Sequence, residues 1–265
     1  MASEGEPQRF LLVSFDRAAI DRLLREQGLP VWSENRPSIL SWMGVERQSR
    51  RRLTDSERDA PVRSALEQTA RARGLPLLFP LMDLEDQGRL QVADLWGDFE
   101  TNIRSASNRY RPDVILTGRL VQVAKTLWRG DWRLYQGDQV SKWESETASQ
   151  VGAAVSGMQH AADLLADRFA PVREQGGLST VRLRVSGISS LDAYTRMGRL
   201  LDSQSSLERA VIVTVDPDAV TYDLHGLGGI QALEQGLEVG GVIEPDTDAT
   251  FTSEDESVDL YFRMR

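Results

Sequence analysis

The segment Val31-Trp-Ser-Glu-Asn-Arg-Pro-Ser-Ile-Leu-Ser-Trp-Met-Gly44 decides how the first part of this chain folds. It places Trp32 and Trp42 on either side of an Arg36-Pro37 step, directly after a stretch with helical spacing of apolar side chains. Proline fixes the backbone φ angle, and tryptophan is a bulky side chain that needs a specific packing environment. We therefore expect a strap between a helix and a strand, in which Trp32, Arg36, Pro37 and Trp42 are structural anchors and Arg36 stacks on an indole or bonds loop carbonyls.

Around this strap, the first half of the chain alternates predicted strands and helices. Strands are predicted at residues 10–15, 39–45, 75–81 and 114–124, and helices at 16–27, 61–73, 98–110 and 149–169. Residues 46–58 are polar and are predicted to be a loop. Residues 132–135 and 140–143 flank Gln136-Gly137-Asp138-Gln139, which predicts a hairpin. The pattern predicts a mixed-sheet α/β sandwich, an α+β fold, over residues 8–172.

The second half has the order β-α-β-β-α-β, which is typical of a ferredoxin-like domain. Its strands are predicted at residues 181–185, 210–215, 220–224 and 258–264, and its helices at 190–202 and 230–237. We place this domain at residues 178–265, after a polar linker at 171–179 that contains two adjacent glycines. Residues 244–256 hold six acidic side chains and are predicted to be a solvated loop, and residues 1–7 a disordered lead-in.

Charge and composition exclude several classes of protein. The net charge of -9 disfavours general nucleic-acid binding, which depends on clustered positive charge. The 265 residues include no cysteine, which rules out disulfides, thiol catalysis and thiolate metal sites. The apolar runs are too short to span a bilayer, so no transmembrane helix is predicted.

Two groups of residues are candidates for contact with a partner. Four arginines gather in the predicted loop: Arg47, Arg50, Arg51 and Arg52. They form either an ordinary solvated loop or a contact with an acidic partner or an anionic membrane surface. All six tryptophans precede the linker, and several are expected in the core. Those near the predicted hairpin (Trp128, Trp132 and Trp143, with Tyr135) are alternatively an exposed aromatic contact face.

No residue pattern specifies a catalytic or metal site. Histidine occurs only at positions 160 and 225, and no phosphate-binding loop, nucleophile elbow or zinc-binding helix is present. Five carboxylates cluster at Asp83, Glu85, Asp86, Asp94 and Asp98, and turn chemistry is preferred over acid–base work or cation binding. Asp94 and Trp96 are read as anchors of a loop, and no cofactor or metal is predicted.

Several of these residues also carry a family resemblance. The strap residues Trp32, Arg36-Pro37 and Trp42, followed by residues 80–86 (Pro-Leu-Met-Asp-Leu-Glu-Asp) and 94–97 (Asp-Leu-Trp-Gly), resemble the bacterial Domain of Unknown Function 2066 family. Residues 110–120 resemble the N-terminal domain of TolB and the curli-secretion lipoproteins. The resemblance implies a periplasmic or envelope-associated location. Since members usually carry a secretion signal, we expect the lead-in to be the start of a trimmed protein.

Three functions follow as hypotheses. The first is a non-enzymatic cell-envelope protein that contacts an envelope partner protein as an interaction or assembly accessory module. The second is a pair of domains that senses a small ligand. The third is a hydrolase that uses the carboxylates of residues 83–98. Exposed aromatics at the hairpin would favour the interaction module. A cavity between the domains would favour the ligand sensor, and buried converging carboxylates would favour the hydrolase.

Overall fold

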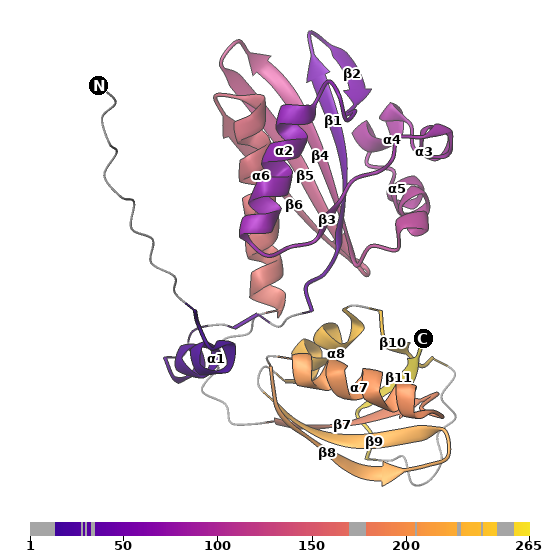
Figure 1. Ribbon diagram of the computed structural model, residues 1–265. Helices are drawn as coiled ribbons and strands as arrows, with labels where there is room; N and C mark the ends of the chain where they lie inside the picture. The colour runs from indigo at the N-terminus through magenta and orange to yellow at the C-terminus, as the bar shows by residue number, and fades with distance from the viewer. Residues whose placement is uncertain are drawn as a thin grey trace, which may run out of the picture.

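A computed structural model describes residues 14–27, 29, 31–32, 35–169, 179–204, 206–226, 229–239, 241–247 and 257–265 (Figure 1). The predicted lead-in at residues 1–7, most of the predicted strand at 10–15 and nearly all of the linker at 171–179 lie outside these ranges. The fold is α+β, as predicted, with two mixed sheets that occupy separate parts of the chain. The domain limits 8–172 and 178–265 remain predictions.

The first sheet has the strand order β2-β1-β4-β5-β6, and β3 also pairs with β1. Its strands are β1 (Ile39–Arg47), β2 (Arg50–Leu53), β3 (Leu77–Leu78), β4 (Val114–Ala124), β5 (Leu127–Gln136) and β6 (Gln139–Thr147). β1 runs parallel to β3 and β4, and the remaining pairs are antiparallel. The predicted hairpin at the 136–139 turn is confirmed as β5 and β6.

Helices cover both faces of this sheet, which makes a three-layer sandwich (Figure 1). On one face lie α2 (Ala60–Ala72) and α6 (Gln150–Phe169); on the other lie α3 (Leu84–Arg89), α4 (Val92–Trp96), α5 (Glu100–Ser107) and the 3-10 turn η1 (Asn108–Tyr110). The central strand β1 is therefore buried along both faces from Ile39 to Val45. This burial explains its nearly continuous apolar sequence, which is typical of a strand with parallel neighbours.

Three local predictions in this half are corrected by the structure. The first part of the predicted loop at 46–58 is a hairpin, because Gln48 and Ser49 adopt the left-handed conformation and return β2 against β1. Residues 83–96 contain two short helices rather than turns, since Asp83 caps α3 and Asp94 closes a capping box at α4. The predicted strand at 75–81 forms only the two-residue strand β3.

The second sheet has the order β10-β11-β7-β9-β8. Its elements are β7 (Ser179–Ser186), α7 (Leu191–Ser203), β8 (Leu207–Val215), β9 (Ala219–Gly226), α8 (Gly229–Glu238), β10 (Ile243–Pro245) and β11 (Leu260–Met264). The predicted order β-α-β-β-α-β is present from β7 to β10. The last predicted strand is β11, which lies between β10 and β7 and runs parallel to β7, so it adds a strand to the ferredoxin-like pattern. β10 lies at the start of the region predicted as an acidic loop.

The strap and α8 connect the two halves. Ahead of the strap, the predicted first helix is α1 (Arg17–Glu26), with Asp16 accepting a hydrogen bond from the Ala19 amide at 3.3 Å. In the strap, the Asn35 amide donates to Ser203 Oγ of α7 at 2.8 Å. Val239, just after α8, belongs to the core of the first half. Within the described residues, no helix combines the length and apolarity needed to cross a membrane.

Candidate functional site

A cleft of about 560 Å³ lies where the first sandwich meets the second sheet. On one side its walls come from α5, η1, β4, β5 and α6 of the first half and from the segments beside them. On the other side they come from α8, β10 and the residues that follow α8 and β11. The residues that line it are Arg104, Ser107, Asn108, Arg111, Pro112, Asp113, Val114, Ile115, Tyr135, Gln136, Gly137, Phe169, Gln235, Glu238, Val239, Pro245 and Arg265. The volume is that of a small-molecule or peptide-segment site, and junctions between domains are common places for such sites.

Three arginines are the cationic groups of the cleft. Arg104 donates through Nε to Glu100 at 2.8 Å, while its Nη2 is buried without a partner in the described residues. Arg265 donates through Nε to Glu244 at 3.0 Å. Arg111 is exposed, and its side chain makes no hydrogen bond or ion pair within the described part of the chain. The cleft therefore offers two incompletely used guanidinium groups, Arg104 and Arg111.

The backbone of Arg111 is held in an unusual conformation. Its φ of 46° and ψ of 50° lie in the left-handed region, which a residue with a Cβ seldom adopts. Its amide donates to the Asn108 carbonyl at 3.2 Å and so ends the 3-10 turn. Backbone strain of this kind is frequent at binding sites, where the surrounding structure holds it in place. Here it presents an unpaired cation at the cleft.

Among the described residues, neither acidic group of the cleft, Asp113 or Glu238, forms an ion pair with Arg104 or Arg111. Asp113 is occupied by Ser38, whose amide and hydroxyl donate to its Oδ2 at 2.8 and 2.7 Å. Desolvation raises the pKa of Glu238, although its side chain reaches solvent, and the neighbouring charge of Glu234 adds to the rise. Burial likewise raises the pKa of Tyr135, which keeps the phenol neutral. The guanidinium groups of Arg104 and Arg111 are therefore the positions in this wall at which an anionic group of a ligand would bind.

The predicted anchors of the strap stand directly behind this cleft. Trp32 stacks on the cleft residue Phe169 with ring centroids 6.2 Å apart, and the Arg36 guanidinium lies 4.2 Å from the Trp32 ring centroid. Pro37 is buried. Trp42 is also buried and donates through Nε1 to Ser107 Oγ at 3.0 Å. The strap thus supports the cleft from the core side.

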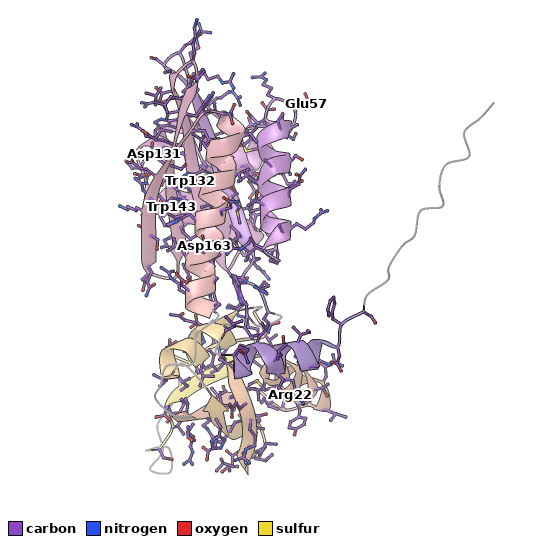
Figure 2. All side chains as sticks on the ribbon, turned by 90° about the vertical axis from the view of Figure 1, so that its left-hand side faces the viewer. Arg22, Glu57, Asp131, Trp132, Trp143 and Asp163 are labelled. Carbon is purple, nitrogen blue, oxygen red and sulfur yellow. The ribbon has the colours of Figure 1, made fainter. Side chains whose placement is uncertain are left out.

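The predicted aromatic contact face is wrong, because the hairpin aromatics are core residues. Trp128, Trp132 and Tyr135 are exposed by only 4%, 0% and 3%. Trp132 and Trp143 lie between the hairpin and α6 (Figure 2), stacked at 6.2 Å between ring centroids. Trp143 is partly buried and is covered by His160 of α6, at 5.0 Å between ring centroids. Sheet side chains alternate between faces: α6 covers the face that carries Trp128, Trp132 and Trp143, whereas Tyr135 lies on the opposite face, in the core cluster that contains Trp42.

The four arginines of the predicted loop lie on the β1–β2 hairpin, and most of them are held there by contacts with other side chains. Arg47 lies over Trp128 at 4.7 Å from the ring centroid, and Arg51 pairs with Glu46 at 2.7 Å. Arg52 forms two hydrogen bonds with buried Asp59. Burial acts to raise the pKa of Asp59, but its bonds to Arg52 and to the backbone lower it overall. Among the described residues, only Arg50 of the four lacks such a partner, so the patch is weaker than the sequence suggests.

The carboxylates of residues 83–98 are all engaged in structural contacts. Buried Asp86 accepts from Tyr110 Oη at 2.6 Å and from Arg109 at 3.1 Å. Asp94 accepts the Gln91 amide at 2.7 Å, and Asp98 accepts from Arg133 at 2.6 Å. Within the described residues no group of three or more metal-binding side chains is found. Trp96, the anchor beside these carboxylates, donates to Glu46 at 3.2 Å. The carboxylates therefore have structural roles, as preferred from the sequence, but as helix caps and ion-pair partners rather than in turns.

Comparisons with known proteins show no family for this chain. No protein-family model matches it, and no curated protein matches it. Among solved structures, the N-terminal domain of Thermus thermophilus Protein Y aligns with 50% of this chain and 96% of its own length, at 9% identity and a TM-score of 0.24. A likeness this low carries no argument about fold or function.

Proposed function

We propose that this protein is a non-enzymatic interaction module of the bacterial cell envelope, which holds an acidic segment of a partner protein in the cleft between its two halves. The observation that supports this most strongly is the pair of incompletely used guanidinium groups, Arg104 and Arg111, on one cleft wall. Guanidinium groups bind carboxylates through paired, charge-assisted hydrogen bonds. The resemblance to the Domain of Unknown Function 2066 family supports a periplasmic or envelope location.

The cleft replaces the hairpin as the surface for a partner. Three of the aromatics of the β5–β6 hairpin are buried and Trp143 is partly buried. Three of the four arginines of the β1–β2 hairpin already have internal partners. The chain as a whole is acidic, so a local group of arginines is the part of its surface that attracts an anion. An extended acidic peptide could lie along the wall and reach Arg104 and Arg111 together.

A small anionic ligand is the second candidate, because the cleft volume of about 560 Å³ falls in the range of small-molecule sites. Such a ligand would make the protein a sensor rather than an interaction module. The two candidates share the arginines and differ in the length of the ligand. They can be separated by comparing a peptide with a compact anion.

The test is calorimetric titration of the purified chain with a capped hexaglutamate peptide and, separately, with citrate. We expect the peptide to bind, with an affinity that falls as salt rises, and Arg111→Glu to weaken it by about tenfold or more. The matched control is Arg50→Glu, which makes the same charge change at an exposed arginine outside the cleft. It should leave the affinity nearly unchanged.

Two results would contradict the proposal. Equal losses from Arg111→Glu and Arg50→Glu would show that the peptide senses overall charge rather than the cleft. Binding of citrate without binding of the peptide, lost in Arg111→Glu, would favour the small-ligand sensor.

A further inference from the structure

The strand β8 leaves an apolar edge of the second sheet open. Within the described residues it pairs only with β9 and ends the strand order. Val211, Ile212, Val213 and Val215 are exposed by 37%, 42%, 46% and 67%. An exposed edge with a run of β-branched side chains is a template for another strand, and proteins usually protect such edges. This edge is independent of the cleft.

The residues of β8 fall into two classes, according to the face of the sheet on which they lie and whether their backbone groups bond to β9. The partner of each residue in β9 shows its class. Val211 opposes Asp223 and Thr214 opposes Thr221, whereas Ala210 opposes Leu224 and Val215 opposes Val220. A register shift at Val213, between Ile212 and Thr214, places Val211 and Thr214 in the same class although they are three residues apart. Ala210 and Val215 share the other class for the same reason. In an antiparallel pair, directly opposite residues must share both their face and their hydrogen-bonding class.

A second copy of β8 satisfies this requirement in a symmetric register that spans residues 209–216. Placing Val211 opposite Thr214 of the other copy also places Ala210 opposite Val215, so both classes match at once. The same register puts Arg209 opposite Asp216. Arg209 is exposed and has no ion-pair partner in the described part of the chain, while Asp216 is partly exposed beside Arg184 at 2.7 Å. Two-fold symmetry forms this opposite-charge pair twice.

We propose that β8 pairs antiparallel with β8 of a second copy of this chain, in the register that sets Val211 opposite Thr214 and Arg209 opposite Asp216. The two second sheets then form one continuous sheet across a closed dimer. The exposed valines and Ile212 are covered along the shared edge. The reciprocal charge pairs select this register, and the two-fold pairing uses the β8 edge of both copies, so the assembly closes at two copies along this edge.

Charge exchange tests the register in the full chain by sedimentation equilibrium. Arg209→Asp and Asp216→Arg should each raise the dimer dissociation constant by about tenfold, since each places like charges opposite one another twice. An equimolar mixture of the two variants should recover a heterodimer of about wild-type affinity, because both charge pairs are then restored. Arg50→Asp is the matched control and should dimerise like the wild type. A monomeric wild type at high micromolar concentration, or a mixture no tighter than the single variants, would overturn the proposal.

Cysteine crosslinking tests the same register without altering Asp216, which also pairs with Arg184 in its own chain. The chain has no cysteine of its own, so introduced thiols report on one contact only. Mild oxidation of mixed Val211→Cys and Thr214→Cys should give a disulfide-linked heterodimer, and Val211→Cys alone should give little product. Efficient self-crosslinking of Val211→Cys with no mixed product would show a different register and refute the one proposed.

Discussion

Replacing Gly157 by alanine is expected to destabilise the protein by about 3 kcal/mol, although alanine is the better helix former. Gly157 lies in α6, and a Cβ there would come within 2.5 Å of Trp132 Cδ2. The indole cannot move away, because Gly118 and Gly130 line other sides of it, at 2.5 Å from their own Cβ positions to Trp132 Cζ3 and Nε1. The three glycines form a slot that only a Cβ-free backbone leaves open for this fully buried tryptophan.

Thermal unfolding followed by tryptophan fluorescence measures this effect, with Gly198→Ala as the matched control. Gly198 is also inside a helix, α7, but an added Cβ there meets nothing within 4 Å. The control should therefore stabilise its helix by about 0.5–1 kcal/mol. Similar melting temperatures for the two variants would mean that the slot does not exist as described.

Removing the carboxyl of Asp86 is expected to cost about 2–4 kcal/mol in the free energy of unfolding. Its side chain is fully buried and accepts from the Met82 amide at 2.8 Å, from Tyr110 and from Arg109. Asp86→Ala leaves these three donors short of an acceptor. The guanidinium of Arg109 also bonds Asp83, so the variant loses less free energy of unfolding than a protein in which an isolated buried ion pair is broken.

Its neighbour Glu85 supplies the control for Asp86. Glu85 contacts the same guanidinium at 3.4 Å, but its side chain is half exposed. Glu85→Ala should change the free energy of unfolding in urea by less than about 0.5 kcal/mol, because exposed ion pairs contribute little to stability. Equal losses for the two alanine variants would contradict the structural role given to Asp86.

The regular elements of this fold were predictable because their patterns are long. α6 has 20 residues and β4 has 11, and patterns of this length separate the helical period from the strand period. The helices α3 and α4 were missed because one turn is too short to show a period. β2 was missed because four arginines suggested a solvated loop and its turn uses Gln48 and Ser49 without a glycine.

The cleft was not predictable from the sequence. Arg265 lies far along the chain from Arg104 and Arg111, and each of the three is an ordinary residue among its sequence neighbours. The aromatic hairpin was misassigned for a related reason, since alternation shows which residues share a face but not which face a distant helix will cover. At this site the sequence predicted the stacking of Arg36 near an indole, and it named Tyr135, which lines the cleft, as a contact candidate.

Crosslinking in living cells is the most direct test of whether the cleft holds an acidic segment of an envelope partner. A photoreactive residue at Gln235 lines the cleft, and one at exposed Lys125, at the far end of the β4–β5 hairpin, serves as the control position. Mass spectrometry then maps the crosslinked residues of the partner. We expect one envelope protein joined at Gln235 through a Glu- or Asp-rich stretch; this adduct should be absent at Lys125 and lost with Arg111→Glu. The same adduct from both positions, or one that persists in Arg111→Glu, would contradict it.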